Sequence, residues 1–193
     1  MTHGRLSHAI ALASATSVGH DRAAVYEMGP EIVIALADGS GNSRRAALAA
    51  EAAVAAFARD DVDWDALDGD VALLGGQCTA VRLRLSADGI RGESIGDSEA
   101  WRFGAGVSVH LTEHQIRKPL LGDGGIPVSF EAGPLAGATL VVATDGLWHY
   151  AKLDAIAAVA RDTDLAMVAT SLVELVRLPT GAFSDDVAVV VVR

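Results

Sequence analysis

The residues best able to do chemistry are carboxylates that stand where apolar strands meet tight turns. Asp38, Asp145 and the pair Asp185-Asp186 each border a run of apolar residues. Buried strands of one domain tend to end at a common edge, so these carboxylates would repel one another unless protons or cations neutralised them. Oxygen ligands at this density suit Mg²⁺ or Mn²⁺, whereas zinc prefers histidine and cysteine. The pattern therefore indicates a divalent cation site.

Two further acids occupy comparable places. Asp97 lies between two predicted strands in "ESIGDSEAWRF", and Asp21 precedes a strand in "GHDRAAV". Each motif alone is compatible with an ordinary surface turn, because Asp and Gly are frequent there. The same design at several strand ends favours one shared site over several unrelated turns.

Composition narrows the classes of protein and of partner. The chain has 193 residues, with 15 Lys and Arg against 25 Asp and Glu, which gives a net charge of −10. Such a balance argues against nucleic acid and against an anionic membrane surface as partners. The length predicts one domain over residues 1–193. No apolar stretch is long enough to predict a membrane-spanning helix.

Cysteine usage bears on the compartment. Cys78 is the only cysteine, so no disulfide can form within the chain, and a reducing, cytoplasmic location is the default. We interpret Cys78 as a small core residue. The stretch from His8 to Val18 has a weak resemblance to a signal peptide, but a strand entering the core is favoured.

The elements that must position the acids follow from periodicity. An apolar run at 31–37 predicts a strand buried on both faces, and residues 80–85 alternate, with Val81 and Leu83 inward and Arg82 and Arg84 on a wet face. Residues 43–60 are Ala-rich without Gly or Pro, which predicts a helix whose packing face includes Leu48. Helices are also predicted near 153–161 and 164–178.

Other segments favour turns and loops. Residues 60–67 predict a short helix or loop that ends at 68–70, and residues 113–137, rich in Gly and Pro, predict a loop. Trp101, Phe103 and Trp148 are assigned to the core, while Trp64 fits either core or surface. Runs of strands with few helices between them predict antiparallel sheets with helices outside, which is a layered α+β fold.

Six motifs, taken in order along nearly the whole chain, resemble the metal-dependent protein phosphatase 2C-like (PPM) family, especially its small bacterial members. The motifs are "GHDRAAV", "ADGSGNS", "GGQCTAV", "GDSEAWRF", "ATDGLW" and "SDDVAVVVV". The resemblance implies an α/β/β/α four-layer sandwich of two antiparallel β-sheets flanked by helices. It also implies two Mg²⁺ or Mn²⁺ ions at one edge of the sandwich.

Roles in the site follow from the same resemblance. Asp38 would bridge both metals, and Gly39 would ligate through its carbonyl, which a side chain would otherwise obstruct. Asp145 and Asp185 would complete one metal's shell, Asp21 would lie beside the second metal, and Asp97 would hold a third, weaker one.

The implied activity is hydrolysis of phosphoserine or phosphothreonine in a protein by a water that the two metals activate. A kinase or its target is the implied partner. The alternative is a catalytically weak or inactive relative that binds a phosphoprotein or a kinase.

Several residues depart from the family pattern. Family members commonly carry an Arg just before the first acidic motif, where it grips phosphate, but here that region is "SATSV". Arg22, His20 and Arg5 are candidate substitutes. Asp186 stands where many relatives have Asn.

A basic segment in the predicted loop is also compatible with two functions. His114, Arg117 and Lys118 lie close together in an otherwise acidic protein. They fit either a surface that receives a phosphopeptide or partner, or an ordinary solvated loop.

Overall fold

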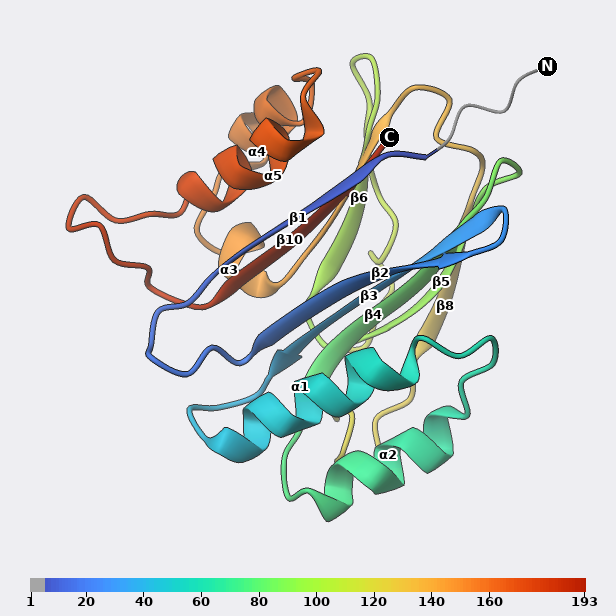
Figure 1. The fold of residues 1–193 in the computed structure, drawn as a ribbon, viewed down its shortest axis with the longest axis vertical. Coiled ribbons are helices and arrows are strands. Elements are labelled where there is room, and N and C mark those ends of the chain that lie inside the picture. Colours follow the sequence, from blue (N-terminus) through green and yellow to red (C-terminus); the bar gives the residue numbers. More distant parts are fainter. Residues whose placement is uncertain (1–5) are drawn as a thin grey trace.

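The structure, a computed structural model that describes residues 6–193, contains two five-stranded antiparallel sheets packed face to face (Figure 1). The first sheet has the order β1 (His8–Ala13), β10 (Val187–Val192), β9 (Thr139–Ala143), β6 (Glu99–Phe103), β7 (Ser108–His110). The second has the order β2 (Asp21–Met28), β3 (Glu31–Gly39), β4 (Cys78–Leu85), β5 (Ile90–Ile95), β8 (Val128–Ala132). The α+β prediction is confirmed.

Helices cover the outer face of each sheet. Over the second sheet lie α1 (Arg44–Ala56) and α2 (Trp64–Leu73), and over the first lie α3 (Asp145–Trp148), α4 (Leu153–Val159) and α5 (Leu165–Glu174) (Figure 1). The four layers are those that the family resemblance implied. Among the described residues, no helix is both long and apolar enough to cross a membrane.

Strand alternation divides the apolar residues between two environments. Ile34 and Leu36 of β3 face Val142 and Val190 of the other sheet, and this layer is completely buried. The alternate residues of β3, such as Ala35, face α1. Each side chain of this size contributes about 1.5–3 kcal/mol on burial, so the layer between the sheets supplies much of the stability.

Small residues set the distance between α1 and the second sheet. Ser43 caps the helix, and its hydroxyl accepts a hydrogen bond from the backbone N–H of Ala46. The packing face contains Ala49, Ala50 and Ala53, all fully buried, whereas Leu48 is 37% exposed. The prediction of a small-residue face is confirmed, but its placement at Leu48 was wrong by part of a turn.

Three other local predictions were wrong. The helix predicted to end at 68–70 continues through Gly69 to Leu73, because Leu67 and Val71 pack under α1 and outweigh the helix propensity of one glycine. The predicted loop at 113–137 contains β8, which pairs with β5. Arg82 is not on a wet face: it is 7% exposed and donates to the carbonyls of Arg59 and Asp60.

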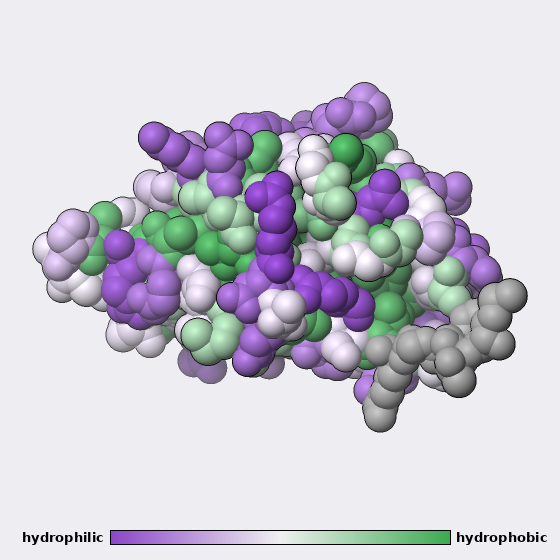
Figure 2. All heavy atoms as spheres, turned by 90° about the horizontal axis from the view of Figure 1, so that it is seen from above, coloured by the Kyte–Doolittle hydropathy of each residue, from purple (hydrophilic) through white to green (hydrophobic). Residues whose placement is uncertain are grey.

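The aromatic assignments fit the structure. Phe103 is buried, and Trp101 and Trp148 are partly buried against the cluster beneath α4 and α5. Trp64, which the sequence left open, packs on Phe57 with ring centroids 5.2 Å apart. The outer surface, seen from one side in Figure 2, mixes hydrophilic and apolar side chains.

The close approach of α1 to its sheet can be tested with Ala50→Leu. The larger side chain has no space at this fully buried position, so we expect the free energy of unfolding to fall by about 1–3 kcal/mol. Leu48→Ala, on the exposed side of the same helix, should cost less than about 0.5–1 kcal/mol. Urea denaturation measures both, and equal losses would contradict this packing.

Candidate metal centre

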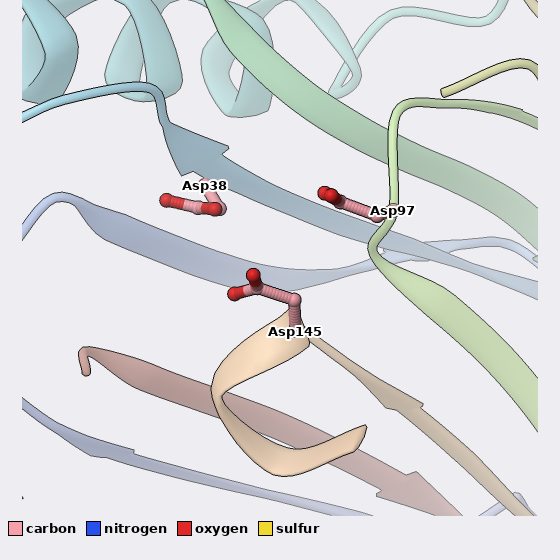
Figure 3. A group of neighbouring side chains, drawn as sticks. All are labelled: Asp38, Asp97 and Asp145. Atoms are coloured by element: carbon pink, nitrogen blue, oxygen red, sulfur yellow. The ribbon is translucent and has the colours of Figure 1, made fainter. Parts of the chain in front are cut away.

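Three carboxylates converge at one edge of the space between the sheets. Asp38 is the last residue but one of β3, Asp97 lies in the turn between β5 and β6, and Asp145 begins α3. One oxygen from each carboxylate lies within 4.8 Å of the others, and all three residues are half-buried (Figure 3). We call Asp38, Asp97 and Asp145 the carboxylate cluster.

The turn that carries Asp97 depends on glycine. Gly96 has a φ of 95°, in the left-handed region, and a side chain there would lie 2.5 Å from the Cβ of Thr79. Thr79 is the antiparallel partner of Asp38, and its hydroxyl hydrogen-bonds the hydroxyl of Ser98 at 2.6 Å. The β5–β6 turn is therefore held against the start of β4, next to the end of β3.

Gly39 also allows a close approach. A side chain at this position would lie 2.3 Å from the backbone carbonyl oxygen of Ala46, in the first turns of α1. Gly39 is buried, and its backbone N–H donates to the carbonyl of His20 at 3.2 Å. The helix, β3 and the start of β2 thus meet beside Asp38.

Asp21 lies directly opposite Asp38 across the β2–β3 pair and is 5% exposed. Its carboxyl group accepts a hydrogen bond from the Thr144 hydroxyl at 2.7 Å, and that hydroxyl in turn accepts from the N–H of Ala188 at 2.9 Å. Burial, followed by the negative charge of Asp38, raises the pKa of Asp21 to about 9. In the absence of cations the Asp21 carboxyl group therefore stays protonated at neutral pH and donates a hydrogen bond to the Asp38 carboxylate.

The carboxylate cluster itself is electrostatically strained. Burial, and then the charges of neighbouring acids including Asp185 and Asp97, raises the pKa of Asp38 to about 6, although the hydrogen bond from Asp21 lowers it. Burial and the charge of Asp38 raise the pKa of Asp145 to about 7. Carboxylates in this state gain stability from any cation that replaces their protons.

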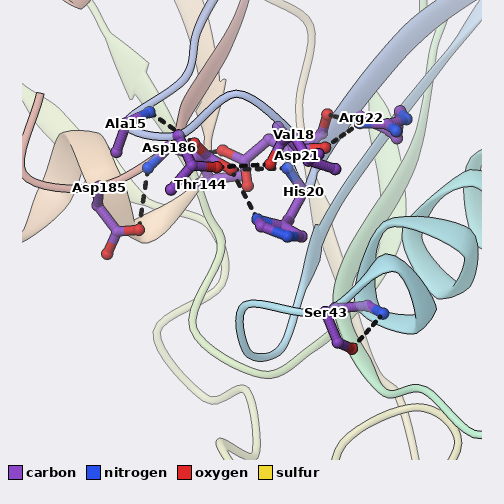
Figure 4. A network of polar contacts seen from close by, with 12 residues as sticks. Ala15, Val18, His20, Asp21, Arg22, Ser43, Thr144, Asp185 and Asp186 are labelled. Atoms are coloured by element: carbon purple, nitrogen blue, oxygen red, sulfur yellow. Dashed lines mark hydrogen bonds and ion pairs between the residues drawn. The ribbon is translucent and has the colours of Figure 1, made fainter.

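Asp185 and Asp186 differ sharply in their surroundings. Asp185 is exposed and lies outside the three-oxygen group, although its charge raises the pKa of both Asp38 and Asp145. Asp186 is 6% exposed and accepts hydrogen bonds from the N–H of Ala15 at 2.7 Å and of His20 at 2.6 Å. Its contact with Nδ1 of His20 is 3.1 Å (Figure 4).

Asp186 therefore fastens the connection between β1 and β2 to the start of β10. Sequence reasoning noted only that Asp186 replaces an Asn, and it did not anticipate this clamp. The only indication of this role in the sequence was the position of Asp186 beside Asp185, directly before a strand predicted to be buried. Two backbone N–H donors and the contact with the His20 ring indicate that the fold itself compensates this buried carboxylate.

The candidate phosphate-binding residues have local partners. The His20 ring meets Asp186, and the Arg22 guanidinium donates to the carbonyls of Gly19 at 2.9 Å and Asp21 at 2.8 Å. Arg22 is on the opposite face of β2 from Asp21 because side chains alternate along a strand. Arg5 lies outside the described residues.

The donor set fits a hard divalent cation. The carboxylate cluster offers only oxygen atoms, from residues that are partly shielded from water, and neither histidine nor cysteine takes part. Mg²⁺ and Mn²⁺ favour such ligands, and bound cations would relieve the repulsion that raises the pKa values of these acids. The cluster thus offers the kind of oxygen ligand that the sequence predicted, from three of the predicted residues.

Solved structures identify the fold. The chain is similar to the serine/threonine phosphatase of S. agalactiae (18% identity, 97% of this chain, 98% of that chain, TM-score 0.83). It is also similar to PppA, a regulatory component of T6SS in Pseudomonas aeruginosa (18% identity, 98% of each chain, TM-score 0.81). The serine/threonine phosphatase PstP/Ppp of Mycobacterium tuberculosis is 21% identical, with 97% of each chain covered and a TM-score of 0.80.

A further structure, the catalytic domain of PstP in complex with two manganese ions, matches 97% of this chain and of its own at 21% identity and a TM-score of 0.75. No family model and no curated protein matches the sequence. The described chain therefore has the fold of the bacterial phosphatase 2C-type serine/threonine phosphatases, as the resemblance predicted.

The raised pKa values predict how stability depends on pH in protein stripped of divalent cations. A carboxyl group with a raised pKa keeps its proton in the folded state at pH values where the unfolded chain, with a pKa near 3.8, has lost it. This contribution is fully present below about pH 4 and is lost as the pH rises through about 6, 7 and 9. We expect the free energy of unfolding in chelator to fall between pH 5 and pH 9.

Urea denaturation at several pH values measures this slope. Asp21→Asn keeps an acceptor for Thr144 without a charge and should remove much of the slope, while Mn²⁺ should flatten it in the unchanged protein. A metal-free protein as stable at pH 9 as at pH 5 would refute the assignment.

The clamp at Asp186 predicts a loss of stability. Asp186→Ala leaves the buried N–H of His20 without its acceptor, which should cost about 1–3 kcal/mol. Asp88→Ala, at an exposed acid, removes the same charge and should change the free energy of unfolding by less than about 0.5 kcal/mol. If thermal or urea denaturation shows equal effects, Asp186 does not fasten the β1–β2 connection.

Proposed function

We propose that this protein is a metal-dependent phosphatase that hydrolyses phosphoserine or phosphothreonine in proteins. The observation that carries the proposal is the carboxylate cluster, formed at the edge of a fold shared with bacterial serine/threonine phosphatases. The two manganese ions of the PstP catalytic domain support Mg²⁺ or Mn²⁺ as the cofactor. We further propose that residues 1–193 act as one catalytic domain in the cytoplasm.

The residues proposed to hold the cations follow the sequence prediction. Asp38 and the Gly39 carbonyl would share the two principal ions with Asp145 and Asp185. Asp21 would act beside the second ion, and Asp97 would hold a third. When bound, the ions would lower the pKa of a water and neutralise charge on the phosphoryl group.

The chain's own residues explain the need for a cation. A phosphate ester approaching this edge meets Asp38, Asp97 and Asp145, whose negative charge repels it. Asp21, buried beneath Asp38, tunes that charge by holding or releasing its proton. Protein without divalent cations should therefore bind and hydrolyse phosphate esters poorly.

A cysteine nucleophile does not fit the same site. Cys78 is fully buried between the second sheet and its helices, and burial raises the pKa of its thiol well above the usual value. The thiolate is the nucleophilic form, so this residue stays inert at neutral pH. Its interpretation as a core residue agrees with its place in the structure.

Hydrolysis of a phenyl phosphate ester with Mn²⁺ tests the proposal. Asp38→Ala, Asp145→Ala or added chelator should each lower the rate by at least about 100-fold, because each removes part or all of the cation site. Asp88→Ala is the matched control and should keep the full rate. Equal rates in all these samples would exclude a metal-dependent phosphatase.

One observation favours a second candidate, a non-catalytic relative that binds a phosphoprotein or a kinase. The β1–β2 connection, residues 14–20, contains no Arg, and the Arg22 guanidinium is engaged by backbone carbonyls. Calorimetric titration with Mn²⁺ separates the candidates. Binding that Asp38→Ala abolishes supports the enzyme, and no binding above background supports the non-catalytic relative.

A further inference from the structure

The arginine and lysine side chains of residues 6–193 differ in whether an acidic side chain neutralises them. Arg82, Arg84, Arg91 and Arg177 all form ion pairs with Asp or Glu. By contrast, the side chains of Arg44, Arg45, Arg117 and Lys118 are exposed, and within residues 6–193 they make no hydrogen bond or ion pair. We call these four residues the basic rim.

Backbone contacts place the segment that carries Arg117 and Lys118 beside the carboxylate cluster. The carbonyl of Ile116 accepts from the N–H of Gly96 at 2.9 Å, immediately before Asp97. A few residues later, Leu121 and Cys78 exchange backbone hydrogen bonds at 3.1 and 3.2 Å. Since Cys78 pairs with Gly39, the segment that carries Arg117 and Lys118 is tied to the neighbours of both Asp38 and Asp97.

Arg44 and Arg45 approach the same edge from α1. They open the helix whose next residue, Ala46, lies against Gly39. The Arg45 side chain lies over Gly75, and Gly76 in turn abuts Gly122, which follows Leu121. The two halves of the basic rim are therefore linked to each other through contacts at Gly75, Gly76 and Gly122.

The sequence of α1 makes these two cations notable. The first turn of a helix favours acidic side chains, because its N-terminal end carries partial positive charge. Here the first turn has no acid and two arginines. The arrangement opposes helix stability and concentrates positive charge beside the cluster, in a protein whose net charge is −10.

We infer that the basic rim binds acidic side chains on either side of the phosphorylated residue, so that the preferred substrates are phosphopeptides with flanking Asp or Glu. The inference rests on the proposed function. The metal ions proposed at the carboxylate cluster would bind the phosphate, while the basic rim binds the carboxylates of the peptide. Its four charges are not neutralised internally, so they are available to a partner.

Two phosphothreonine peptides test the inference. They differ only in having two Glu or two Gln on each side of the phosphothreonine, and kcat/KM is measured for each with Mn²⁺ at low salt. The protein should favour the Glu peptide by about fivefold, which corresponds to two exposed charge pairs. The R117Q/K118Q variant should lose this preference, and about 0.5 M salt should suppress it in the unchanged protein.

Two controls exclude a general effect of charge or folding. R59Q/R161Q removes the same charge from exposed positions at the far end of α1 and after α4, and should keep the preference. Phenyl phosphate, which has no flanking residues, should be hydrolysed equally by R117Q/K118Q and the unchanged protein. A preference that survives R117Q/K118Q, or is lost equally in R59Q/R161Q, overturns the inference.

Fluorescence anisotropy keeps the result independent of catalysis. If no substrate is hydrolysed, the proposed phosphatase fails, but tighter Mn²⁺-dependent binding of the Glu peptide that requires Arg117 and Lys118 still supports the rim. Equal binding of the two peptides by the unchanged protein, with equal turnover or none, rejects it.

Discussion

Repulsion among acids at the edge of the sandwich is the constraint on which the site depends. The fold places Asp38, Asp97 and Asp145 within reach of one ion and buries Asp21 behind them. Like charges so close together are unfavourable unless protons or cations intervene. The raised pKa of Asp21, about 9, shows how strongly burial favours a neutral group there. The proposed affinity for cations would thus follow from the fold.

Rigid packing holds that arrangement in place. The two sheets close on apolar side chains between them, while small residues on α1 let its backbone approach β3. Gly39 and Gly96 remove side chains where the backbone passes another element closely. Hydrogen bonds of Asp186 then hold the β1–β2 loop against the start of β10, and those of Thr144 join β2 to β10. The carboxylates meet because the elements that carry them have little freedom to separate.

Local patterns in the sequence predicted these features unequally. The apolar run before Asp38 and the alternation around Val81 predicted strands correctly, although both strands prove to be buried on both faces. Predictions from composition were wrong for α2, where tertiary contacts of Leu67 and Val71 outweigh the low helix propensity of Gly69. They were also wrong for β8, which pairing with β5 stabilises. The prediction of a wet face at Arg82 failed for the same reason. Alternation indicates on which face a side chain lies, but not which other segment covers that face.

The sequence by itself determined the α+β class, the chain's acidity and the recurrence of acids at strand ends. These features depend on residue type and short-range spacing, which can be read directly from the order of residues along the chain. Only the tertiary structure decided that Asp38, Asp97 and Asp145 converge while Asp185 stays exposed, and that Asp186 is a buried clamp. Those outcomes depend on distances and burial between segments more than 40 residues apart, set by packing the two sheets together.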